Sequence, residues 1–124
     1  MSLATDPDAA RLPPLIRDMA ECIGLEAALK VATYRPGRRC YFPATPGADH
    51  PIAQLIGHSA ALRLCTVYGG DYLHMPSLRR YENAKRNRAI CQALANGTAT
   101  AAQLARRYGL REDSVYAIKR EAAA

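Results

Sequence analysis

The side chains best suited to specific recognition lie near the C-terminus, in a segment that follows Gly109. If this segment is helical, one set of residues faces outward from it: Arg111, Glu112, Asp113, Tyr116, Ala117 and Arg120. A guanidinium can donate two hydrogen bonds to a guanine edge, a carboxylate can accept from cytosine, and a tyrosine can contact a thymine methyl or a phosphate. This face therefore carries the donors and acceptors needed to read bases in the major groove of double-stranded DNA.

A second group of polar side chains is better suited to the DNA backbone, because lysine and arginine bind phosphates without reading sequence. Its members are Lys85, Arg86, Arg88, Thr100, Arg106, Arg107 and Lys119. Glu112 and Asp113 oppose affinity for a polyanion, and two interpretations stay open for them. Either they read bases, or they stabilise the positive N-terminal end of their helix.

Two helices at a fixed angle must hold these side chains, and residues 100–120 fit a helix-turn-helix. Thr100 caps the first helix, Ala105 is small where the helices touch, and Gly109 supplies a left-handed turn. The predicted shared core consists of Leu104, Tyr108, Leu110, Val115 and Ile118.

Positive charge is concentrated in the same part of the chain. The 124 residues include 17 Lys and Arg against 11 Asp and Glu, a formal net charge of +6. Residues 1–76 contain seven of each sign, whereas residues 77–124 contain ten basic and four acidic residues. Such segregation is typical of a surface that binds a polyanion. A predicted helix from Ser77 to Asn96, whose basic residues precede its apolar ones, extends that surface.

The first 76 residues contain an internal duplication with an offset of 33 residues. Residues 23–30 align with residues 56–63, and Thr33, Gly37 and Pro43 recur at the same offset. Each copy predicts a short helix, a glycine break, a second helix, a turn and a short strand.

The predicted strands are Arg39–Phe42 and Tyr72–Met75. In the second strand, Leu73 and Met75 alternate with Tyr72 and His74, so the two pairs face opposite sides. Because an isolated two-stranded ribbon is only marginally stable, the strands need covering helices, further strands or a second subunit at an exposed edge. We therefore predict a homodimer.

These elements predict a mainly α-helical (α+β) chain. A disordered start at residues 1–11 precedes a dimerisation domain at residues 12–76, which is built from copies 12–43 and 45–76. The helix-turn-helix domain follows at residues 77–124.

Other function classes find little support in the sequence. No Ser-His-Asp order, phosphate-cradling glycine loop or acidic pair indicates an enzyme or a bound cofactor, and we predict neither. His50, His58 and His74 lack ligand spacing, and the four cysteines form no C-x-x-C pair, so neither a metal site nor a disulfide framework is expected. No apolar run suits a membrane span or signal peptide, and we expect a soluble cytoplasmic protein.

Several linked motifs run through the chain from about Leu12. They are Ile56-Gly57-x-x-Ala60-Ala61-x-x-Leu64, Tyr68-Gly69-Gly70, a strand ending at Pro76, Arg86-Asn87-Arg88-x-Ile90 and Leu104-Ala105-Arg106-Arg107-Tyr108-Gly109-Leu110. Together they resemble the Mor/C family of phage middle- and late-gene transcription activators. The resemblance implies a dimer that binds an imperfect dyad upstream of a promoter and recruits bacterial RNA polymerase, on phage DNA or the host nucleoid.

On this resemblance, Arg111 to Arg120 form the recognition helix, and one segment forms the dimer strand and the hinge between domains: Tyr68, Gly69, Gly70, Tyr72, Leu73, His74, Met75 and Pro76. The first copy departs from the pattern, with Arg35-Pro36-Gly37 where the second has Tyr68-Gly69-Gly70. Arg111 also stands where relatives often have a capping serine. The alternatives to an activator are a DNA-binding repressor or accessory phage protein, and a dimerisation module that does not bind DNA.

Overall fold

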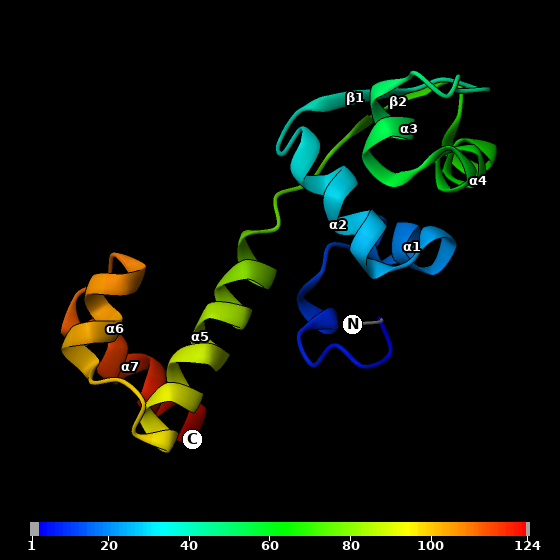
Figure 1. Ribbon diagram of the computed structural model, residues 1–124. Helices are drawn as coiled ribbons and strands as arrows, with labels where there is room; N and C mark the ends of the chain where they lie inside the picture. The colour runs from blue at the N-terminus through cyan, green and yellow to red at the C-terminus, as the bar shows by residue number, and fades with distance from the viewer. Residues whose placement is uncertain (1–2, 124) are drawn as a thin grey trace. The chain divides into compact units, whose positions relative to one another are not determined.

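The computed structural model describes residues 3–123 and is mainly helical, with one small sheet (Figure 1). In chain order the elements are a 3-10 helix η1 (Ala9–Arg11), α1 (Pro14–Ile23), α2 (Leu25–Tyr34), β1 (Arg39–Phe42), α3 (Pro51–Ile56), α4 (His58–Tyr68), β2 (Asp71–His74), α5 (Arg79–Asn96), α6 (Ala101–Tyr108) and α7 (Glu112–Ala123). The predicted mainly α-helical class is confirmed.

The chain divides into two compact units, one up to Tyr81 and one from Glu82 onward. The sequence predicts a boundary before Ser77, somewhat earlier. The difference arises because Leu78 and Tyr81 are buried in the core of the first unit, so the first turn of α5 belongs there. Residues 1, 2 and 124 of the predicted domains lie outside the described part of the chain.

Two helix pairs of the same build make up most of the first unit. Gly24 separates α1 from α2 with φ 91° and ψ 155°, and Gly57 separates α3 from α4 with φ 93° and ψ 148°. Each glycine N–H donates to the carbonyl four residues earlier, on Ala20 or Ala53. Because glycine adopts positive φ without steric penalty, the chain makes the same reversal in both copies.

Strands β1 and β2 pair with each other in an antiparallel sheet. The register is Arg39 with His74, Cys40 with Leu73, Tyr41 with Tyr72 and Phe42 with Asp71. Strand β1 has its predicted bounds, whereas β2 begins and ends one residue earlier than predicted. The predicted alternation is confirmed, since Tyr72 and His74 are exposed, Leu73 is half-buried and Met75 is fully buried.

The core of the first unit lies between the helices and one face of the sheet. Its largest fully buried side chains are Ile16, Met19, Phe42, Ile52, Leu64 and Met75. Cys40 and Cys65 belong to the same core, and all four cysteines of the chain are free. Burial raises the pKa of both buried thiols, although the charge of Arg35 opposes the shift at Cys40. The two buried cysteines thus act as small apolar residues.

The N-terminal segment differs from the disorder expected for residues 1–11. Within residues 3–11 the chain forms turns and the helix η1, and Asp6 and Asp8 are buried. The Tyr81 hydroxyl donates a hydrogen bond to the Asp6 carboxylate, 75 residues away in the sequence. This long-range contact holds the segment on the first unit. No local sequence pattern predicts it.

Candidate nucleic-acid interface

Three helices of the second unit surround a small apolar core. The buried members are Ile90 of α5, Ala101, Leu104 and Ala105 of α6, and Val115 and Ile118 of α7. Tyr108 and Leu110 pack at the edge of this cluster, half-buried. All the residues predicted to form the shared core are therefore present in it.

Helix α6 begins with a reciprocal capping box. The Thr100 hydroxyl accepts from the Gln103 N–H at 3.2 Å, and the Gln103 side-chain oxygen accepts from the Thr100 N–H at 2.9 Å. Thr100 was predicted as a cap, whereas Gln103 was missed, although the T-x-x-Q spacing is its sequence signature. Because the hydroxyl only accepts in this box, its own proton stays available to a phosphate oxygen.

Gly109 forms the turn between α6 and α7. It has φ 66° and ψ 34°, and its N–H donates to the Ala105 carbonyl. The Leu110 N–H donates to the same carbonyl at 2.8 Å, while the Arg111 carbonyl accepts from Val115 at 3.2 Å as α7 begins. These bonds and the shared core fix the start of α7 relative to α6.

The base-reading candidates lie on α7 and on the residue before it. Five of the six are exposed, namely Arg111, Glu112, Asp113, Tyr116 and Arg120, whereas Ala117 is half-buried. Glu112 and Asp113 occupy the first turn of α7. Both interpretations of these carboxylates fit that position, since the first turn carries the positive end of the helix dipole and also projects most readily into a groove.

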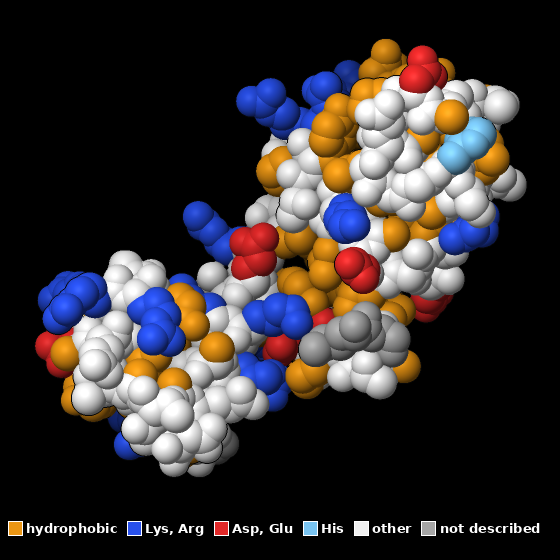
Figure 2. All heavy atoms as spheres, viewed as in Figure 1, with side chains coloured by type: hydrophobic (Ala, Val, Ile, Leu, Met, Phe, Trp, Pro, Cys, Tyr) orange, Lys and Arg blue, Asp and Glu red, His pale blue; other side chains and the backbone are white. Residues whose placement is uncertain are grey.

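The phosphate candidates fall into two groups. Arg106 and Arg107 are exposed in the last turn of α6, and Lys119 is exposed on α7. On α5, Lys85 and Arg88 already take part in interactions within the chain. Figure 2 shows Lys and Arg side chains spread over the visible face of the second unit. The α6 and α7 residues are therefore the more accessible of the phosphate candidates.

Arg86 has a different local role from the other candidates. Its Nε and Nη2 atoms both donate to the side-chain oxygen of Asn87, at 3.1 and 2.9 Å. The side chain is half-buried on α5. This fork orients the guanidinium while leaving other donors for a phosphate.

The residues predicted for the dimer strand and hinge all belong to the first unit. Gly69, with an ordinary φ of −65°, is confined: an added Cβ would lie 2.3 Å from the Cys65 oxygen and 2.8 Å from the Ala44 Cα. Gly70 takes the left-handed φ of 84°. Half-buried Tyr68 ends α4, and burial, together with nearby acidic groups, raises its pKa. The Gly-Gly pair thus serves close packing at one position and chain reversal at the other.

Histidines of the first unit form local hydrogen bonds. His50 Nδ1 accepts from the Ile52 N–H at 3.2 Å and caps α3, and His58 Nε2 lies 3.1 Å from the Pro46 carbonyl oxygen. Within residues 3–123, no group of three or more His, Cys, Asp or Glu side chains is arranged to hold a metal ion. No helix in that range has the length and apolar character needed to cross a bilayer.

Comparison with known protein families identifies the family to which the chain belongs. Residues 45–124 match the family described as the Mor transcription activator family. The chain belongs to this family. The matched segment contains the second copy and all of α5 to α7, whereas the first copy precedes it. The family resemblance seen in the sequence is thereby confirmed, and the Mor family is one of transcription activators. No curated protein and no solved structure matches the chain.

Proposed function

We propose that this Mor-family protein is a sequence-specific DNA-binding activator of phage or prophage genes that recruits bacterial RNA polymerase. The observation that carries the proposal is the α6, Gly109 and α7 geometry, in which a left-handed turn and a shared core hold α7 with its polar side outward. In a helix-turn-helix of this kind the second helix enters the major groove and the first crosses the backbone. Membership of an activator family supports activation in addition to binding.

The contacts divide by position. Arg111 stands at the start of α7, where recognition helices reach base edges, and it supplies the bidentate donor suited to guanine. Arg106 and Arg107 lie in the last turn of α6 and supply phosphate contacts. Tyr116 is 48% exposed on α7 and offers a ring to a thymine methyl or a hydroxyl to a phosphate.

DNA binding is tested by titrating the full chain against duplex DNA at several salt concentrations. If Lys and Arg side chains displace counterions from phosphates, the logarithm of the affinity falls linearly with the logarithm of the salt concentration. Footprinting of the region around the gene then locates the site. Absence of an interaction would leave the interaction module that does not bind DNA as the better description, and a salt-independent interaction would contradict the proposed phosphate contacts.

Activation is tested separately from binding. Transcription in vitro with bacterial RNA polymerase should rise at a promoter beside the footprint. A repressor or an accessory phage DNA-binding protein would give the same footprint without raising initiation. That outcome would retain the DNA-binding part of the proposal and remove the polymerase contact.

The homodimer that the sequence predicts rests on the need of short strands for a partner. Since β1 and β2 are partners within one chain, a second copy would have to join elsewhere, for example at the outer edges of the two strands.

A further inference from the structure

The sheet of the first unit pairs equivalent residues of the two copies. Cys40 lies opposite Leu73, and these residues are 33 positions apart, the offset of the duplication. On either side of this pair, Tyr41 faces Tyr72 and Arg39 faces His74. A register centred on two equivalent residues means that each copy presents its strand to the other in the same way.

The hydrogen bonds beyond the strand ends exchange in the same manner. The Gly37 N–H donates to the Met75 carbonyl at 3.0 Å. One copy later, the Gly70 N–H donates to the Phe42 carbonyl at 2.6 Å. Gly37 is equivalent to Gly70 and Phe42 to Met75, so the two bonds are one contact made twice with the partners reversed. Such reciprocity is the mark of a two-fold, isologous interface.

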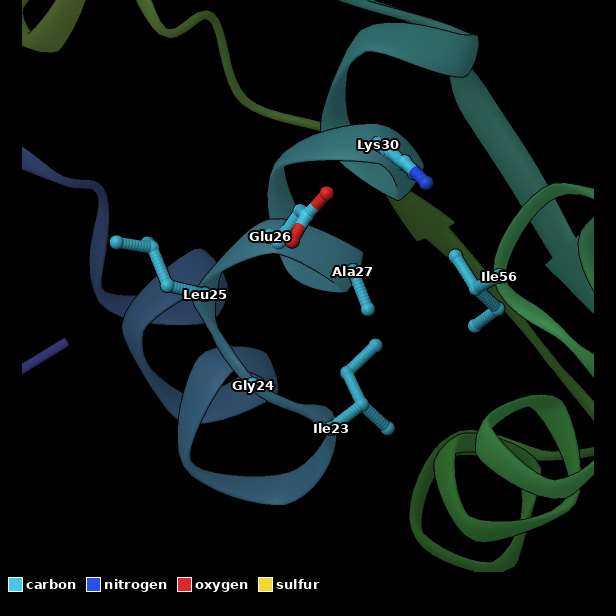
Figure 3. A pocket seen from close by; sticks show the side chains of 7 residues that line it. All are labelled: Ile23, Gly24, Leu25, Glu26, Ala27, Lys30 and Ile56. Carbon is cyan, nitrogen blue, oxygen red and sulfur yellow. The ribbon is translucent and has the colours of Figure 1, made fainter. Parts of the chain in front are cut away.

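The helices follow the same rule. Helix α1 packs against α4, and α2 packs against α3, which is the same contact with the copies exchanged. Ala28 and its equivalent Ala61 are both fully buried. Ile23 and its equivalent Ile56 both line a hollow of about 460 Å³, although its other lining residues all belong to the first copy (Figure 3). The two-fold relation therefore extends from the sheet through the helices.

We infer that residues 12–43 take, within one chain, the place that a second subunit would take against residues 45–76. The family match supports this division, because it begins at residue 45 and so contains one copy and one set of α5 to α7. The first copy adds the partner surface but no second recognition helix. Phe42 and Met75, the apolar residues at this contact, are both 0% exposed in the single chain. Neither leaves an apolar surface for a further chain to cover. The protein is therefore a monomer whose first unit is complete.

The consequence for DNA, which rests on the proposed function, is a target without two-fold symmetry. A two-fold dimer presents two recognition helices to two half-sites, and its operator is an inverted repeat. A monomer with one α7 per chain contacts a single asymmetric element.

Sedimentation equilibrium of the full chain tests the inference without DNA. We expect the 13.5 kDa mass of one chain across the concentration range. A mass of two chains would overturn the inference that the protein is a monomer, and the cross-link described next would then show whether the strands still pair within one chain.

A cross-link at the sheet checks that the pairing is within one chain. Tyr41 and Tyr72 face each other on the exposed side, with ring centroids 4.9 Å apart, and opposite residues of an antiparallel pair have a Cα spacing that suits a disulfide. The double variant Tyr41→Cys with Tyr72→Cys should give a cross-linked monomer on a non-reducing gel. Tyr41→Cys alone is the control for the four native thiols. A cross-link between two chains would overturn the inference by showing that copies are exchanged between subunits.

Selection of bound duplexes from a random-sequence pool tests the DNA consequence. We expect one asymmetric element, and an inverted pair of elements would overturn it. If no duplex is selected, the proposed function fails, while the sedimentation result still decides the inference about the first unit.

Discussion

Cys40 lies directly opposite Leu73 in the sheet, and each is the equivalent of the other in the two copies. The pairing explains how a two-stranded sheet persists in so small a unit. Cys40 is 5% exposed, so the strands have an inner face sealed by helices. On the outer face the Arg39 guanidinium lies 4.8 Å from the centroid of the Tyr72 ring. The sheet thus gains stability from the burial of one face and from cation–π contact on the other.

The two copies differ at the turn between the second helix and the strand, where the first copy has Pro36 and the second has Gly69, and this difference predicts a sensitive glycine. An alanine Cβ at position 69 would lie 2.8 Å from the Cα of Ala44 and 3.0 Å from the Pro43 oxygen, both backbone atoms. Since backbone can yield only by moving the chain, Gly69→Ala should lower the free energy of unfolding by about 1–3 kcal/mol. Urea unfolding followed by circular dichroism measures the change.

The matched control is Pro36→Ala, at the equivalent position of the first copy. Pro36 already carries a Cβ, so this change adds no atom to the turn. We expect a smaller loss of stability than for Gly69→Ala. Equal losses at both positions would contradict the close approach between Gly69 and the connecting segment.

Local patterns were sufficient to predict most elements of the fold, because their signals are local. Gly109 at a left-handed turn and the strand Arg39–Phe42 both follow from residue types and spacing within a few positions. The contact between Asp6 and Tyr81 could not be predicted, since it joins residues far apart in the sequence. The pairing partner of each strand could not be predicted from the sequence either. Alternation marks a strand and its buried face, but it does not say whether the partner comes from the same chain.

The candidate site shows the same division. Helical periodicity predicted which side chains of α7 point away from the core, and Val115 and Ile118 are buried as expected. Periodicity could not show that Lys85 and Arg88 take part in other interactions within the chain. Long basic side chains reach neighbours from several turns away, so their partners depend on packing that a helical pattern does not contain.

Substitution of Gly109 tests the turn that orients α7. Its φ of 66° is strained for alanine, so Gly109→Ala should lower the free energy of unfolding by about 1–2 kcal/mol. Asparagine tolerates this conformation better, and Gly109→Asn should lose less. Thermal unfolding of the two variants beside the original chain measures the order. If alanine and asparagine are equally tolerated, the left-handed turn is not needed.

The buried thiols predict an order of chemical reactivity. Burial raises the pKa of Cys40 and Cys65, so their thiols stay protonated at pH values where an exposed thiol ionises. Alkylation by iodoacetamide, followed by mass spectrometry, should therefore be slower at these residues than at half-buried Cys22 and Cys91. Equal rates at all four residues would contradict the burial.

The same shift fixes the sign of a pH effect on stability. Because the pKa of Cys40 and Cys65 is higher in the folded than in the unfolded chain, the folded state keeps these protons longer. The stability that the protonated thiols give the folded state is complete below the ordinary thiol pKa. It is lost as the pH rises through the raised pKa of the folded state. The urea concentration at the unfolding midpoint should decrease as the pH rises through that alkaline range. Cys65→Ala should reduce this fall. A fall of the same size in Cys65→Ala would assign it to other groups.

Substitutions of Arg111 and Arg107 test the proposed separation of base reading from phosphate binding. Arg111 precedes the first turn of α7 and is assigned to a base edge, whereas Arg107 lies in the last turn of α6 and is assigned to a phosphate. Arg111→Ala should reduce discrimination at one base-pair position by about 1–3 kcal/mol. Arg107→Ala should weaken binding to all sequences alike and lower the salt slope by about one unit.

Affinities for a panel of duplexes with single base-pair changes, each at two salt concentrations, measure both effects. The comparison is matched, because both variants remove one exposed guanidinium from the same unit and change the net charge equally. A difference between them therefore reflects position and not charge. If both variants weaken every duplex to the same extent, Arg111 does not read a base, and α7 would have to be oriented differently on the DNA.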